Sequence, residues 1–151
     1  MIQSLTGITN GMVRNAPRFG EVAHRVTEMV QGRIFTAHNA PFDWRFVCHE
    51  MEHATGTTPA GRTLCTVRVA RKLLPSLTSR SLDSLAMYFG LEIESRHRAL
   101  DDAVATAHVL LHFLEMLDAD DVRGWDELER YLNRRAPRAK RTASPRSMKE
   151  A

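Results

Sequence analysis

Apolar residues recur at helical spacing in several segments of this chain, and two short β-prone runs lie between them. Phe19, Val22, Val26, Met29 and Val30 recur at helical spacing, which predicts an amphipathic helix. The run IFTAHN that follows is short and apolar, so it predicts a strand that ends at His38. Pro41 suits a first helical position, and the helix that it opens carries Asp43 in its first turn.

The second half of the chain repeats this alternation and then becomes helical. A second strand is predicted around TLCTV, followed by helices over VRVARKLLP and SLDSLAMYFG, the latter capped by Ser81 and ended by Gly90. Further helices are predicted over ALDDAVATAHVLLHFLEMLDA and around Trp125, whereas SLTGITNGMVRNAP reads as a loop with at most one helical turn. Strands that alternate with helices predict an α/β fold with a parallel sheet. Two strands are few for such a sheet, so we expect part of it to be missing.

The long helix that begins near residue 99 has two predicted faces. Its core-facing stripe is expected to contain Ala103, Ala107, Leu110, Leu114 and Leu117, opposite Asp101, His108, His112 and Glu115. On this helical wheel Asp101 points toward solvent, whereas Asp102 is half turned toward the sheet.

Length and composition narrow the class of protein. A chain of 151 residues with 43% apolar residues suits one domain. We find neither a leader-like segment nor the roughly 18 to 20 consecutive apolar residues that a membrane span needs, and we therefore expect a cytoplasmic protein without membrane contact. Cys48 and Cys65 form no disulfide framework or cysteine-rich zinc motif.

Basic charge is concentrated at the C-terminal end. Residues 134–151 hold seven of the 21 Lys and Arg residues against the single acid Glu150, which leaves 14 basic and 17 acidic residues in the rest of the chain. This tail is rich in Pro, Ser and Ala, so we expect it to be disordered. Electrostatic attraction to nucleic acid would lie mostly there, although a merely solubilising tail is an equal alternative.

Two His-Asp pairs share one spacing and one kind of location. His38 and Asp43 are five residues apart, as are His97 and Asp102, and each aspartate stands in the first turn of a predicted helix. Sites of parallel α/β proteins lie at the carboxyl ends of the strands, where the two pairs could converge. Carboxylates that hold two divalent ions, with a histidine as base, suit phosphodiester hydrolysis, and hard oxygen ligands favour Mg²⁺ or Mn²⁺. The alternative is that each aspartate only favours its helix N-terminus electrostatically.

The order of these motifs resembles that of a known family. LTGIT followed by AP, then AHNAPFD, ARKLLP, SLDSLAMYFGL and HRALDDAVATA, resembles the DEDDh branch of the 3′-to-5′ exonucleases, over roughly residues 4–117. The resemblance implies a ribonuclease-H-like fold, a two-metal site for Mg²⁺ or Mn²⁺, and single-stranded DNA 3′ ends as substrate. By this likeness Asp43 and Asp102 are metal ligands and His97 is the general base. His38, Asn39 and Phe42 would shape the site beside the terminal nucleotide.

The sequence departs from the family at its first motif. An Asp-x-Glu on the opening strand supplies two of the family's four carboxylates, but no Asp precedes Asp43, and the earlier acids Glu21 and Glu28 lie on a predicted helix. We therefore expect an N-terminally truncated α/β fold in which the opening strands are absent and two parallel strands with flanking helices remain. The expected parts are a partial exonuclease domain (1–118), an amphipathic helix (119–133) and the basic tail (134–151). Either the chain is a truncated product or it is a degenerate relative.

Other functions follow from the same residues. With half of the carboxylates absent, a non-catalytic module that binds nucleic acid or a polymerase subunit is the main alternative, and RNA is as open a substrate as DNA. The exposed sheet edge predicts self-association. His49, Glu50 and His53 also satisfy the zinc-protease pattern H-E-x-x-H, but Pro59 stands where the longer pattern expects a third histidine.

Overall fold

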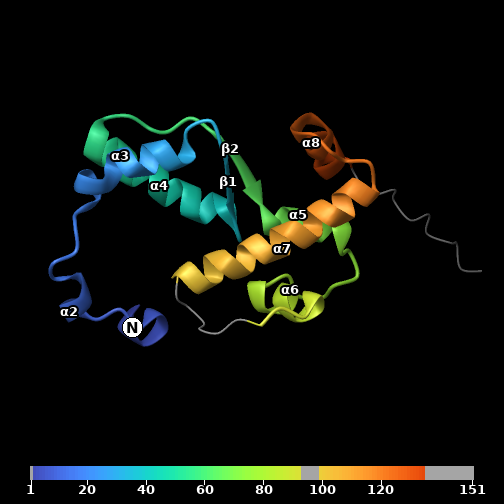
Figure 1. Cartoon of the computed structure of the whole chain (residues 1–151), viewed down its shortest axis with the longest axis horizontal. Coiled ribbons are helices and arrows are strands. Elements are labelled where there is room, and N and C mark those ends of the chain that lie inside the picture. The colour runs from blue at the N-terminus through green and yellow to red at the C-terminus, as the bar shows by residue number, and fades with distance from the viewer. Residues whose placement is uncertain (1, 93–98, 135–151) are drawn as a thin grey trace, which may run out of the picture.

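The computed structural model describes residues 2–92 and 99–134. Within them the elements follow the chain as shown in Figure 1: α1 (Ile2–Thr6), α2 (Asn10–Val13), α3 (Phe19–Val30), β1 (Ile34–Ala37), α4 (Ala40–Thr55), β2 (Arg62–Cys65), α5 (Thr66–Leu73), α6 (Leu82–Phe89), α7 (Ala99–Ala119) and α8 (Trp125–Asn133). The predicted tail, apart from Arg134, lies outside the described residues. The helices and strands expected from residue 19 onward are confirmed.

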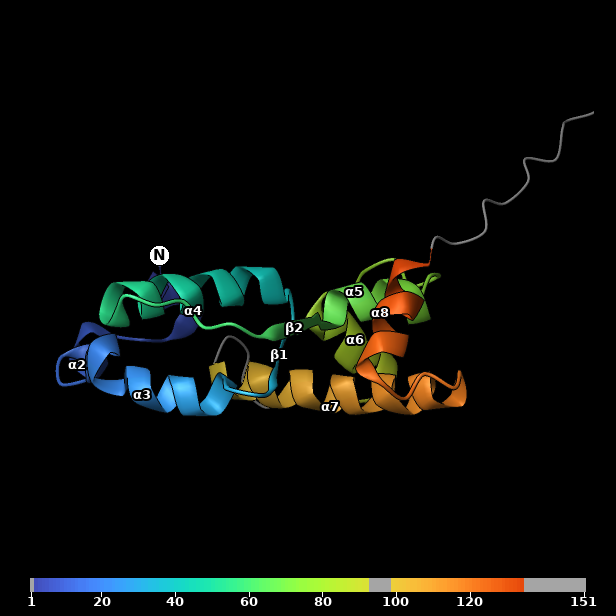
Figure 2. The same cartoon turned by 90° about the horizontal axis from the view of Figure 1, so that it is seen from above.

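The two strands form a parallel pair. Ile34 lies opposite Arg62 and Ala37 opposite Cys65, so both strands end at the same edge. The helix α4 connects them and packs against both. Figure 2 shows α3 and α7 on one side of the strands and α4 on the other. The predicted parallel α/β arrangement is confirmed, and within the described residues the sheet has these two strands.

Local sequence signals fix the helix ends near the sheet. At α6 the Ser81 side chain accepts a hydrogen bond from the Ser84 backbone N–H at 3.2 Å, and Gly90 ends the helix in the left-handed region at φ 68°. At α4 the preceding residue Asn39 takes φ 69°, a conformation that asparagine tolerates better than most residues, and Pro41 stands in the first turn. The turn between β1 and α4 therefore has a defined shape.

The main core lies on the side of β2. It joins that strand to α5, α6, α7 and α8 through nine buried residues: Leu64, Val69, Ala70, Leu74, Leu85, Val109, Phe113, Leu117 and Leu128. The small helix α8 adds an ion pair to this packing, since Arg68 Nη1 lies 3.1 Å from Glu129 Oε1. Around β1 and α3, in contrast, few residues are buried. The sheet is therefore well covered beside β2 but poorly covered beside β1.

The predicted core stripe of α7 is confirmed only in part, since Leu117 is buried and Leu110 packs against the core. The buried residues are Ala105, Thr106, Val109, Phe113 and Leu117, whereas Ala103, Ala107 and Leu114 are exposed. The reason is that α7 is apolar around most of its circumference, so the period alone does not select the buried face. His112, predicted on the polar face, is half-buried and stacks on Phe89 with ring centroids 4.6 Å apart.

The rotation of α7 also changes the expected difference between its two aspartates. Asp101 and Asp102 are both half-buried, so their burial does not separate them as the helical wheel predicted. Asp102 continues the buried face, because Ala105 and Thr106 follow it by three and four positions.

One further expectation needs correction. The N-terminal segment contains two short helices, α1 and α2, where one turn at most was predicted. On α3 the apolar residue Met29 is 64% exposed. No helix among the described residues is both long enough and apolar enough to span a membrane.

An apolar face of α7 remains exposed. It contains Leu100, Val104, Leu111 and Leu114, all at least 46% exposed, and on β1 Ile34 is 42% exposed. Within the described residues, β1 pairs with β2 alone, so its other edge has no partner strand there. We call the exposed face of α7 and this edge of β1 together the open-edge surface.

Candidate active site at the carboxyl ends of the strands

The carboxyl ends of β1 and β2 bring two polar residues together. Ala37 and Cys65 are register partners, and the next residue of each segment is His38 and Thr66. His38 Nδ1 lies 3.0 Å from Thr66 Oγ1, and Thr66 is fully buried as the first residue of α5. The site therefore has a fixed polar centre at the edge where parallel sheets place their ligands.

Burial and three neighbours govern the charge of His38. Burial lowers the pKa of the imidazole below its ordinary value, while a hydrogen bond to the backbone of Arg80 and the charges of Asp43 and Asp102 raise it. Burial is the largest of these effects, so the fold favours the neutral form of the ring.

The two candidate metal carboxylates come from different helices. Asp43 lies in the first turn of α4 and Asp102 in the first turn of α7, and each is half-buried. Both act electrostatically on the same His38 ring, so the fold brings the two aspartates to one neighbourhood. This is the convergence on which the predicted site depends. His97, the predicted general base, lies outside the described residues.

The donor set suits one hard cation better than two. Carboxylate oxygens are ligands that Mg²⁺ and Mn²⁺ accept, and Mg²⁺ often takes only one or two of them and keeps several waters. In the described part of the chain, no group of three His, Cys, Asp or Glu residues is placed to hold a metal ion. Two carboxylates leave half of the charge of two divalent ions unbalanced, so these residues alone do not fit a two-metal site.

The earlier glutamates do not supply the missing ligands. Glu21 and Glu28 both lie on α3, as the sequence predicts. Glu21 is occupied in the helix cap, where its Oε2 accepts a hydrogen bond of 2.7 Å from the Arg18 backbone N–H.

An aromatic surface borders the site. Phe42 and Phe46 are both about half exposed on α4, with ring centroids 5.0 Å apart, and the guanidinium of Arg45 lies 5.9 Å from the centroid of the Phe46 ring. Asn39, also exposed, precedes this surface at the helix start. Exposed rings beside a cationic group suit the stacking of unpaired bases.

Sequence reasoning missed two residues of this site. Thr66 follows the second strand as His38 follows the first, so the parallel register could have identified it. Arg80 had no comparable signal, because a loop places it: its Nη2 donates to the carbonyls of Leu74 and Pro75 at 3.1 and 3.0 Å, while its backbone contacts His38.

The H-E-x-x-H pattern falls on the surface. His49, Glu50 and His53 are exposed on α4, and the described residues provide no third ligand beside the two histidines.

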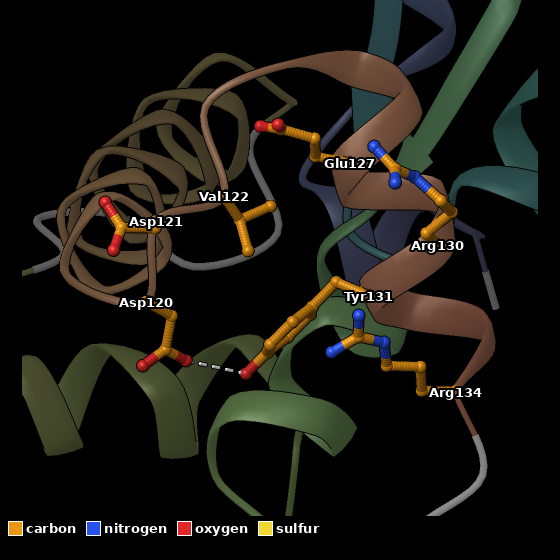
Figure 3. A pocket seen from close by; sticks show the side chains of 7 residues that line it. All are labelled: Asp120, Asp121, Val122, Glu127, Arg130, Tyr131 and Arg134. Atoms are coloured by element: carbon orange, nitrogen blue, oxygen red, sulfur yellow. Dashed lines mark hydrogen bonds between the residues drawn. The ribbon is translucent and has the colours of Figure 1, made fainter.

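A polar pocket is separate from the candidate site. It lies between the end of α7 and α8, and in Figure 3 the Tyr131 hydroxyl donates to Asp120 at 2.9 Å. Asp120 is about 27 Å from Asp102 along the helix axis.

Known proteins resemble the chain over most of its length. The sequence model of the exonuclease family, of the ribonuclease T type, matches residues 1–110. DNA polymerase III subunit epsilon of Aquifex aeolicus is 37% identical over 116 residues, which are 77% of this chain and 57% of that protein. DNA polymerase III of the PolC type from Caldanaerobacter subterraneus is 34% identical over 134 residues, 89% of this chain but only 10% of that protein.

A solved structure agrees with these sequence relatives. The chain aligns with exonuclease X, determined in complex with 5′ overhanging duplex DNA, at a TM-score of 0.58 and 26% identity, over 76% of this chain and 64% of that one. The α/β fold with two parallel strands therefore corresponds to part of an exonuclease fold. The chain spans between a tenth and somewhat over half of the length of the two polymerase relatives. By sequence and by fold, this chain belongs to the DEDDh exonuclease family.

Proposed function

We propose that this chain supplies the second and third motifs of a 3′-to-5′ exonuclease site that removes nucleotides from the 3′ end of single-stranded DNA. The observation that carries the proposal is the shared electrostatic contact of Asp43 and Asp102 with His38 at the carboxyl ends of the strands. Two acids and a neutral histidine drawn from separate elements suit a phosphodiester hydrolase better than they suit helix capping alone. DNA is favoured because relatives are named DNA polymerase III proteins and exonuclease X binds DNA.

Each site residue has a proposed role. Asp43 and Asp102 hold Mg²⁺ or Mn²⁺, and His97 removes a proton from the attacking water. Asn39 and Phe42 contact the terminal nucleotide, the aromatic ring by stacking, and His38 shapes the site beside them. When bound, divalent ions would stabilise charge on the attacking and leaving oxygens. Because two carboxylates do not balance two such ions, we expect turnover only when a further acidic pair is supplied.

The test compares two proteins on a 5′-labelled single-stranded DNA with Mg²⁺ or Mn²⁺. One is the chain itself, and the other carries an added β-meander with an Asp-x-Glu. We expect products shortened from the 3′ end with the second protein only. In that protein His97→Ala should lower the rate by about 10² to 10⁴, the range for loss of a general base. Full activity of the His97→Ala variant would overturn the role of His97. Inactivity of the protein with the added β-meander and an intact His97 would overturn the proposed site.

A second candidate function is binding without hydrolysis. It is favoured by the absence, within the described residues, of a three-ligand metal group. In this case the chain would hold single-stranded nucleic acid or a DNA polymerase subunit, aided by the basic tail. Deletion of residues 134–151 should weaken DNA binding and reduce its dependence on salt, because fewer counterions are released. Fluorescence anisotropy with DNA and RNA of one sequence, at two salt concentrations, would measure both effects.

A further inference from the structure

The candidate site contains a histidine that interacts with two polar neighbours. His38 Nδ1 lies 3.0 Å from Thr66 Oγ1, and the ring also forms a hydrogen bond with the backbone of Arg80. The first contact joins the ends of β1 and β2, and the second joins β1 to the loop before α6. A side chain held from two directions has little rotational freedom.

The partners also determine where the proton of the neutral ring lies. A carbonyl can only accept, so the Arg80 backbone requires an N–H on the imidazole. Nδ1 faces the Thr66 hydroxyl, which leaves Nε2 for the Arg80 carbonyl; a proton on Nε2 then makes Nδ1 an acceptor for the hydroxyl. In this arrangement neither nitrogen remains available for a metal ion or for a proton from water.

We propose that Thr66 is a positioning residue of the candidate site, whose buried hydroxyl holds His38 as the Nε2–H tautomer in one orientation beside Asp43 and Asp102. This inference rests on the proposed function for the site that it describes. It deepens that function by giving His38 a role other than ligand or base: an uncharged spacer that leaves both carboxylates their full charge for a cation.

The surroundings support a precise role for this hydroxyl. Thr66 is fully buried at the start of α5. Arg80 is held in turn, since its guanidinium donates to the carbonyls of Leu74 and Pro75 near the end of the same helix. The segment from α5 to the loop before α6 thus presents the Thr66 hydroxyl as donor and the Arg80 carbonyl as acceptor to the ring. Asp43 and Asp102 are the charged groups that act on it from α4 and α7.

The test is nitrogen NMR of the full chain with ¹⁵N-labelled histidine, in which the His38 signals are assigned by their loss in His38→Gln. In the wild-type protein at pH 7.5 we expect one tautomer, with the proton on Nε2. An Nδ1–H tautomer or a mixture of the two would overturn the proposal without any variant. A lack of nuclease activity would leave this result unchanged, so failure of the proposed function is distinguishable from failure of the positioning role.

A matched pair of variants isolates the hydroxyl. Thr66→Ser keeps the donor and should keep the wild-type spectrum. Thr66→Val keeps the shape but removes the donor, so the Nδ1 signal should shift. The pKa of His38 should then rise by about 0.5 to 1, because the neutral ring loses a hydrogen bond. Identical His38 spectra and titrations in both variants, with native circular dichroism, would show that Thr66 is only a packing residue.

Discussion

The imidazole of His38 and the hydroxyl of Thr66 lie 3.0 Å apart although 28 positions separate the two residues in the chain. Each directly follows the last residue of a strand, and the parallel register sets these ends side by side. Two helices then carry Asp43 and Asp102 toward the same ring. The pairing of the strands therefore places His38 and Thr66, and the positions of two helices place Asp43 and Asp102 near them.

Burial of His38 predicts a pH-dependent stability. Its pKa is lowered in the folded protein, so as the pH falls through about 6.5 the unfolded chain takes up a proton that the folded protein does not. The free energy of unfolding should therefore decrease from pH 7.5 toward pH 5.5, and His38→Gln should reduce this decrease. Urea unfolding at the two pH values measures it. His108→Gln, at an exposed position of α7, should retain the wild-type decrease. If His108→Gln reduced the pH-dependent decrease as much as His38→Gln does, the effect could not be assigned to His38.

The orientation of α7 gives a test with two residues of the same type. Leu117 is 1% exposed and belongs to the core, whereas Leu114, three positions earlier, is 46% exposed. Leu117→Ala should cost about 2 to 5 kcal/mol of unfolding free energy, the range for a buried leucine. Leu114→Ala should change it by no more than about 0.5 kcal/mol, as at most surface sites. Denaturant unfolding compares the two, and equal large losses would restore the face predicted from the sequence, which contains both leucines.

The adjacent aspartates of α7 should differ in function despite similar burial. Asp102 acts on the His38 ring, and Asp101 is not among the groups that affect the pKa of that ring. In a protein supplied with an Asp-x-Glu strand, Asp102→Asn should lower the exonuclease rate by at least about 10², as loss of a general base would. Asp101→Asn should lower it far less. Single-turnover rates with Mn²⁺ provide the measurement, and equal losses would place both aspartates at the metal.

Short-range signals made most of the elements predictable. Gly90, Pro41 and the Ser81 cap act within a turn, so the sequence alone locates α4 and α6. The strands were predicted by composition, and their common edge by the rule for parallel sheets. These signals also placed Asp43 and Asp102 in the correct helix turns.

What the sequence could not determine depends on three-dimensional packing. Apolar residues surround α7, so only contact with α5 and α6 selects the face that contains Phe113 and Leu117. Arg80 reaches the site through a loop conformation that no periodicity encodes. Thr66 is an intermediate case, because its position after β2 was visible but its burial was not.

The open-edge surface predicts self-association of the chain. Leu111 and Leu114 on α7 remain exposed beside Leu100 and Val104, and within the described residues β1 has one edge without a partner strand. Apolar patches and unpaired strand edges both favour contacts between chains. The protein should therefore sediment as oligomers whose size increases with concentration. Leu111→Glu should shift this distribution toward monomer, because association would bury the new charge.

A variant on another surface serves as the control for that experiment. Met87 is 82% exposed on α6, outside the open-edge surface. If association uses that surface, Met87→Glu adds the same charge but should leave the sedimentation profile unchanged. An equal effect of both variants would point to a general effect of charge on solubility. A wild-type chain that sediments as a monomer at all concentrations would contradict the prediction, since the apolar face of α7 would then be tolerated in water.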